Sequence, residues 1–185
     1  MREVINKLEE LGDWIGALGD LSDPIWFEPL DAGKWSIAEC IAHLLFWEWH
    51  ALEHHLPRLE PGAVLGAPPE PQTLNERAAF YARSGIPKAR VIGDFVVARR
   101  TFVNRVRQLE HLPWDATFHL GERALDLHTY LRERLEHDRH HQDQIRQALR
   151  VLTPVTAHPR HGALEHRIRP EITRARALAP SKGNA

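Results

Sequence analysis

Three histidines in this sequence have the type and the spacing to hold a metal ion. His137 and His141 are four residues apart, so on a helix they lie on the same side, one turn from each other. His43 belongs to a separate segment that also has helical character. Neutral imidazole is the commonest metal-binding side chain at physiological pH. A site with three imidazoles leaves coordination positions open for water or substrate, as in catalytic rather than structural metal sites.

The elements that must position these histidines are helices. Apolar residues recur at helical spacing in long segments, and Ser36 with Glu39 forms a capping box where one of them starts. A shorter helix over 73–83 is predicted to open with a second capping box, Thr73 with Glu76. Four long helices favour an all-α fold, a four-helix bundle. The long segments are 2–19, Ser36 to Pro57, Pro87 to about Glu110, and 125–152.

The remaining segments are predicted to be connections. Residues 20–35, 61–71 and 111–123 contain the prolines, glycines and irregular patterns expected of loops. Strand signal is weak, and short alternating stretches such as 115–120 are too few to predict a sheet. We therefore divide the chain into a helical bundle domain, residues 1–152, and an irregular tail at 153–185.

Composition and charge exclude several classes of protein. The 185 residues carry a net charge of −1, which gives no overall field for nucleic acid or membrane surfaces. The tail is basic and contains prolines, with six Lys or Arg against Glu165 and Glu171, hence +4, but it has no aromatic residues to stack on bases. Cys40 is the only cysteine, so no intramolecular disulfide forms. No apolar run reaches the ~18–20 residues of a membrane span. We expect a cytoplasmic protein that binds neither nucleic acid nor membrane.

Other side chains fall beside the histidines on the predicted helices. At about 100° per residue, His50 lies on the His43 side of its helix, next to Trp47. Tyr130 and Arg134 share the edge of His137 on the last helix. Facing edges of this kind line a cleft, so these four are candidate substrate-binding residues. The alternative is that they form exposed or core helix surface.

Further side chains near the histidines have less specific predictions. Cys40 is expected to be a small buried residue rather than a thiolate ligand. Asp138 is predicted to point toward the core and to accept a hydrogen bond from an imidazole. Glu48 is predicted to lie on the surface.

Two motif regions resemble the DinB/YfiT-like superfamily of helix-bundle metalloproteins. They are WSIAECIAHL, from Trp35 to Leu44, and the segment from Tyr130 to Ile145 that contains HDRHHQDQI. The resemblance covers about residues 1–152. In that family one histidine of the second helix and a His-x-x-x-His pair of the last helix bind a divalent metal. Carried over to this sequence, the ligands are His43, His137 and His141.

The resemblance implies a site more firmly than a reaction. The family metal is zinc, nickel or another divalent ion, and imidazoles also accept iron or manganese. Some relatives are transferases or isomerases that use low-molecular-weight thiols. We therefore expect a metal-dependent transferase or hydrolase that activates water or a thiol toward a small-molecule substrate. A non-catalytic module that binds metal or a small ligand is the alternative, and a structural bundle with incidental histidines is a third reading.

Two further expectations concern mechanism and assembly. Residues 138–140, between the histidines of the pair, include no glutamate of the kind that serves as general base in His-Glu-x-x-His proteases. A protease is therefore not expected. A homodimer is consistent with the fold, since related bundles often pair through helix faces.

Overall fold

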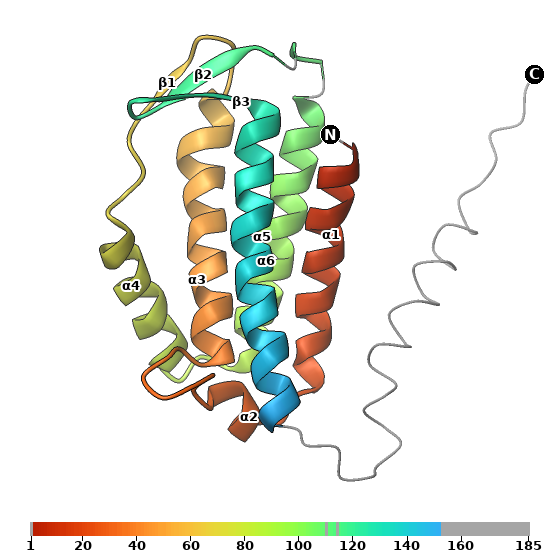
Figure 1. The fold of residues 1–185 in the computed structure, drawn as a ribbon, viewed down its shortest axis with the longest axis vertical. Helices are drawn as coiled ribbons and strands as arrows, with labels where there is room; N and C mark the ends of the chain where they lie inside the picture. The colour runs from red at the N-terminus through yellow and green to blue at the C-terminus, as the bar shows by residue number, and fades with distance from the viewer. Residues whose placement is uncertain (1, 110, 114, 153–185) are drawn as a thin grey trace, which may run out of the picture. The chain divides into compact units, whose positions relative to one another are not determined.

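The structure, a computed structural model, describes residues 2–109, 111–113 and 115–152. Four long helices run side by side in this part of the chain (Figure 1), so the predicted four-helix bundle is confirmed. They are α1 (Arg2–Ala17), α3 (Ile37–His50), α5 (Lys88–Gln108) and α6 (Leu127–Leu152). The predicted tail at 153–185 lies outside the described residues.

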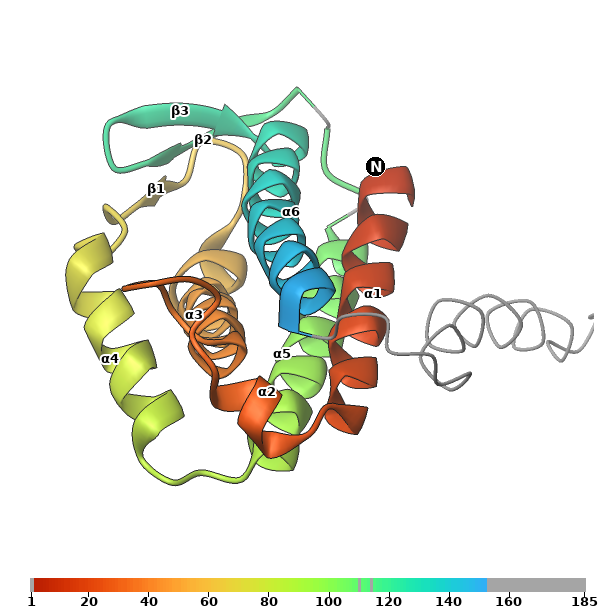
Figure 2. The same cartoon turned by 60° about the horizontal axis from the view of Figure 1, so that its bottom comes forward.

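The bundle core is built from the apolar faces that the sequence indicated. Figure 2, which looks more nearly along the helices, shows α1, α3, α5 and α6 around a common interior. α5 packs closely against both α1 and α3, whereas the backbones of α3 and α6 approach each other less closely. Side chains therefore fill the space between α3 and α6, and the three histidines belong to these two helices.

The start of α3 forms as predicted. The Ser36 backbone N–H donates to Glu39 Oε2 at 2.8 Å, and Ser36 Oγ accepts from the Glu39 backbone N–H at 3.3 Å. Both halves of the capping box are present. After His50 the helix widens into a π-helical turn, Ala51–His55, followed by a 3-10 turn, Leu56–Arg58, which contains Pro57. The predicted end of this helix near Pro57 is confirmed.

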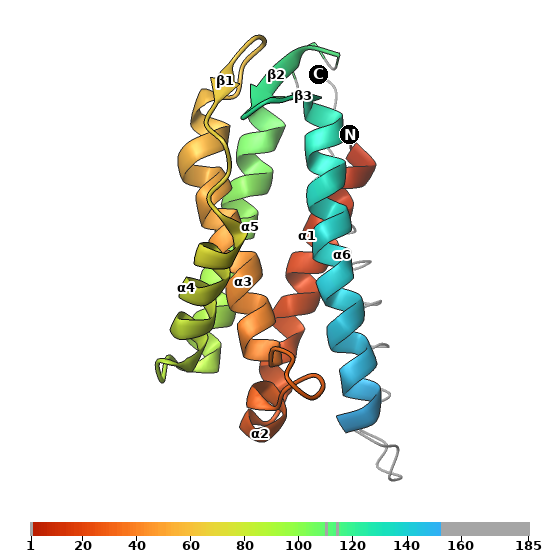
Figure 3. The same cartoon turned by 60° about the vertical axis from the view of Figure 1, so that its left-hand side comes forward.

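Two shorter helices flank the bundle. α2 (Asp23–Phe27) lies within the segment predicted as a connection, and Figures 1 and 3 show it at the end of the bundle opposite the strands. α4 (Pro71–Arg83) packs against α3. The predicted capping box at Thr73 is wrong, because α4 begins two residues earlier, with Glu70 at the N-cap and Pro71 in the first turn.

A small sheet at one end of the bundle contradicts the all-loop reading of two connections. β1 (Val64–Leu65) pairs in parallel with β2 (Thr117–Leu120), which pairs antiparallel with β3 (Arg123–Asp126). Gly121 turns the hairpin at φ 59°, a conformation that favours glycine. The sheet adds Phe118 and Leu125 to the core. Each strand is too short to give a periodic signal, and β1 and β2 are far apart in sequence.

A helix that crosses a membrane must be both long and apolar. No helix in the described part of the chain combines the necessary length with the necessary apolar character.

Candidate metal centre

The structure brings His43, His137 and His141 together between α3 and α6. His43 Nε2 lies 2.9 Å from His137 Nε2, and the ring centroids of the three side chains are 4.7–5.0 Å apart. One ring nitrogen from each residue lies within 4.8 Å of the others. We call these three residues the histidine cluster. Residues 94 or more positions apart in the chain thus converge on one point, as the sequence predicted.

Burial keeps two of the three imidazoles neutral. His43 is 5% exposed and His141 8% exposed. Burial, reinforced by the neighbouring imidazoles, lowers the pKa of His43 to about 3 and that of His141 to about 4. At neutral pH these rings therefore carry a free lone pair, which is the form that binds metal.

The donor set and its spacing fit a divalent ion. Zinc–nitrogen bonds of about 2.0–2.1 Å in a tetrahedral site place two ligand nitrogens roughly 3.3 Å apart. The nitrogens of the cluster, 2.9 Å apart for one pair and all within 4.8 Å, reach that arrangement through small side-chain rotations. Three imidazoles leave at least one coordination position for water or substrate.

Two tryptophans enclose the cluster along the helix axis. The Trp35 ring lies 4.9 Å from His43 and stacks on His141 with an interplanar angle of 20°. Trp47 lies 6.3 Å from His43 and 6.4 Å from His137, with its edge toward both rings. These aromatic walls limit the approach of water to the cluster.

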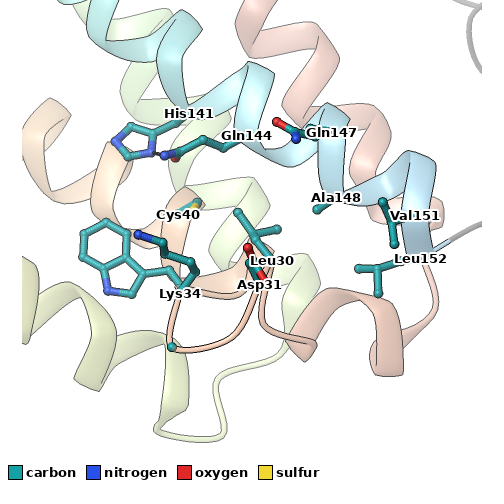
Figure 4. A pocket seen from close by; sticks show the side chains of 12 residues that line it. Leu30, Asp31, Lys34, Cys40, His141, Gln144, Gln147, Ala148, Val151 and Leu152 are labelled. Atoms are coloured by element: carbon teal, nitrogen blue, oxygen red, sulfur yellow. Dashed lines mark hydrogen bonds between the residues drawn. The ribbon is translucent and has the colours of Figure 1, made fainter.

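A cavity of about 580 Å³ opens beside the cluster, on the side of Trp35. His141 forms part of its wall, and Figure 4 shows Gln144 and Lys34 extending toward the same space. Among the described residues, no hydrogen bond or ion pair engages the Lys34 ammonium. Leu30, Ala148, Val151 and Leu152 give the rest of the cavity apolar surface. The cavity can therefore hold a small molecule with polar and apolar parts, within reach of a metal ligand.

Cys40 also lines this cavity, as a neutral side chain. The residue is 1% exposed, and burial raises the pKa of its thiol to about 12. It is absent from the group whose atoms converge on the metal position. Its prediction as a small buried residue is confirmed.

The candidate substrate-binding residues lie on the other side of the cluster, toward the sheet. Tyr130 is buried, and its hydroxyl lies 3.0 Å from His55 Nδ1. Arg134 forms an ion pair with Glu48. Trp47 packs on the cluster, and its ring lies 6.2 Å from that of His50. None of the four predicted residues lines the cavity beside His141; substrate binding by them stays a prediction.

The prediction of a surface position for Glu48 is wrong. Its side chain is fully buried and accepts from Arg99 Nε at 2.7 Å, while Arg99 Nη2 donates to Asp138 Oδ2 at 2.7 Å. With Arg134, these residues form a buried ionic network. Asp138 points into the core as predicted. Burial alone raises the pKa of its carboxyl, but the Arg99 guanidinium, the His137 ring and the Arg134 charge together outweigh burial and leave the pKa well below its usual range.

One position in the sequence does indicate this network. Arg99 lies four residues after Phe95 and three before Phe102, so it falls on the apolar stripe of α5. A charged residue on such a stripe requires a buried partner of opposite charge.

Comparisons with known proteins identify the family and support the fold. Residues 9–145 match the model of the DinB superfamily. The chain is similar in fold to YfiT from Bacillus subtilis, which is described as a probable metal-dependent hydrolase with an unusual four-helix bundle topology. The TM-score is 0.67 and the identity 16%, over 82% of this chain and 87% of YfiT. No curated protein matches the chain.

Proposed function

The chain belongs to the DinB superfamily, and on that premise we propose that it is a divalent-metal-dependent enzyme. Its ligands would be His43, His137 and His141, and its substrate a small molecule. The observation that carries the proposal is the convergence of three imidazoles, two of them buried, next to a cavity. A purely structural cluster would not need a cavity beside it.

A bound divalent ion lowers the pKa of a coordinated water or thiol and so supplies a nucleophile near neutral pH. The imidazoles of the histidine cluster hold the ion and leave a position open. Imidazole ligands suit zinc or nickel best among the metals considered, with iron and manganese as further options.

The residues around the cluster favour approach of the substrate from the cavity. On the sheet side, the Trp47 ring packs against the cluster, and the charged groups of the buried ionic network are already paired with one another. On the other side, the cavity wall includes His141 itself, and the Lys34 ammonium is free to pair with an anionic group. A substrate held there would lie beside His141, one of the residues that would hold the ion.

The residues between His137 and His141 offer no free carboxylate that could act as a general base. A nucleophile would therefore be generated at the metal. Asp138, the acidic residue adjacent to His137, is committed to Arg99. Hydrolysis and transfer of a low-molecular-weight thiol both fit this arrangement. The description of YfiT as a probable metal-dependent hydrolase makes hydrolysis the first reaction to assay.

Assays of turnover test the proposal. Protein purified without a His tag and loaded with zinc or nickel is offered a panel of esters and amides, and a panel of electrophiles with cellular thiols. Turnover is expected in the unchanged protein and is expected to disappear in His137→Ala. His128→Ala is the matched control, because His128 is an exposed residue of the same helix outside the cluster.

Two results would contradict the proposal in different ways. Stoichiometric metal without turnover across both panels would make the protein a non-catalytic metal- or ligand-binding module. Absence of bound metal would make the bundle a structural protein.

A further inference from the structure

Two rings of the histidine cluster, those of His43 and His137, present the same nitrogen to each other. The 2.9 Å approach between His43 and His137 joins their Nε2 atoms. Their Nδ1 atoms are therefore on the opposite side of each ring, directed away from the shared centre. A histidine that binds metal through Nε2 must carry its proton on Nδ1, and a hydrogen-bond acceptor at Nδ1 fixes this tautomer.

Gln144 supplies such an acceptor for His141. The Gln144 side chain places Oε1 2.9 Å from His141 Nδ1 and Nε2 3.0 Å from His140 Nε2. A carbonyl oxygen only accepts, so His141 Nδ1 is the donor of this bond. The remaining nitrogen of His141, Nε2, then holds the lone pair that faces the cluster.

Asn75, on α4, is in position to do the same for His43. His43 Nδ1 and Asn75 Oδ1 are both buried, and neither has a partner within hydrogen-bond geometry among the described residues. α4, which carries Asn75, packs against α3, which carries His43. Buried polar groups without partners are costly. A small rotation that pairs these two atoms removes both costs.

Asp138 stands in the same relation to His137. Its Oδ1 lies 3.8 Å from His137 Nδ1, while its Oδ2 accepts from Arg99 Nη2 at 2.7 Å. Arg99 thereby holds the carboxylate in place. At 3.8 Å the carboxylate attracts an Nδ1–H without a direct hydrogen bond, and a short movement of the more exposed His137 ring closes the contact.

From these contacts we propose that Asn75, Asp138 and Gln144 are positioning residues that make all three histidines bind the ion through Nε2. The inference rests on the proposed metal site and adds which residues determine the ring nitrogen that each histidine offers to the ion. The three acceptors come from two helices, and those at His43 and His141 fix the tautomer before any metal arrives. Gln144 also lines the cavity, so a molecule bound there contacts the group that orients His141.

Nitrogen NMR on protein labelled with ¹⁵N-histidine tests the tautomers directly. In the metal-free protein, His43 and His141 are expected to show a protonated Nδ1 and an unprotonated Nε2. After addition of one equivalent of zinc, the Nε2 resonances of all three histidines are expected to shift as coordinated nitrogens. A metal-bound Nδ1 at any of the three positions would overturn the inference.

Zinc affinity, measured by competition with a chelator, tests the acceptors. Gln144→Leu and Asn75→Leu are each expected to weaken binding about 10–100-fold. Gln144→Glu, which keeps an acceptor at the same place, is expected to retain the affinity. Gln147→Leu is the matched control, since Gln147 lines the same cavity one turn further along α6. Equal affinities for Gln144→Leu and Gln147→Leu would contradict the positioning role.

Failure of the proposed function would look different. A protein that binds no zinc, yet shows Nδ1–H tautomers at His43 and His141, would disprove the metal site while leaving the acceptor assignment intact. A protein that binds zinc through Nδ1 would support the metal site but disprove the acceptor assignment.

Discussion

Polar residues gather on both sides of the histidine cluster, and the two groups differ in how their bonding capacity is used. Toward the sheet, Glu48, Arg99 and Asp138 are at most 3% exposed and are paired with one another. Toward α2, Lys34 and Gln147 are exposed around a cavity, and within the described part of the chain no hydrogen bond or ion pair engages the Lys34 ammonium. The first group is closed on itself, whereas the second can still bind a ligand.

This difference shows why proximity to a metal centre is poor evidence of a role in substrate binding. Arg134 lies on the same helix as His137, but its charge is already neutralised by an ion pair with Glu48. Lys34 comes from a loop before α3 and has no such partner among the residues that the structure describes. A charge that is already neutralised by a buried partner would have to break that pair before it could hold a substrate, and breaking buried pairs is costly.

The largest effect is expected on stability, from a change in the closed side of the cluster, the paired group of Glu48, Arg99 and Asp138. Arg99→Met leaves Asp138 buried without its cation and removes one partner of Glu48. Removing one member of a buried ion pair costs about 3–5 kcal/mol, and the free energy of unfolding, measured in urea, is expected to fall by that amount.

An exposed ion pair provides the control for this experiment. Arg107→Met removes the partner of Glu9, and both side chains of that pair are about 40% exposed. A loss below about 1 kcal/mol is expected there. Similar losses for the two variants would show that the network around Arg99 is not the closed, self-satisfied region described above.

A second test of the closed side uses pH. Burial, with the charges of His50 and Arg134 added, lowers the pKa of His55 from 6.5 to about 4. His55 therefore takes up a proton near pH 6.5 in the unfolded chain but only near pH 4 in the folded protein. Stability contributed by the neutral ring is complete above pH 6.5 and is lost as the pH falls toward 4, by about 2–3 kcal/mol for this group.

The corresponding measurement compares urea unfolding of the metal-free protein at pH 7 and pH 4.5. The loss of stability between the two pH values is expected to be smaller in His55→Gln than in the unchanged protein. An identical loss in both would mean that His55 is not held neutral by its buried position beside Tyr130.

The open side is tested by filling the cavity. Val151 is 73% exposed on α6 and lines the cavity. Val151→Trp is expected to leave folding and metal content unchanged and to lower kcat/KM about tenfold. Val97→Trp, at a 65% exposed position of α5 away from the cavity, is expected to leave kcat/KM unchanged. If the two variants behave alike, substrate does not approach through this cavity.

Local signals in the sequence predicted much of the fold and the centre of the site. The capping box at Ser36 fixed the start of α3 because both of its hydrogen bonds join residues three positions apart. The i, i+4 spacing of His137 and His141 placed both on one side of α6. In each case the relevant partners are neighbours on one helix, so their relation follows from helix geometry alone.

What sequence reasoning missed depends on how separate elements dock. Glu48 was expected on the surface because its partner, Arg99, comes from a different helix 51 residues away. β1 could not be predicted, because two residues in a loop rich in proline and glycine form a strand only when β2 lies beside them. Asn75 approaches His43 only because α4 packs on α3.

The central claim is that three imidazoles from α3 and α6 bind one divalent ion. The most direct test is the metal content of tag-free protein after equilibration with zinc or nickel and removal of the excess by gel filtration. We predict one equivalent per chain in the unchanged protein and in His128→Ala, and none in His43→Ala or His137→Ala. Folded His43→Ala or His137→Ala protein that retained a full equivalent would contradict the account.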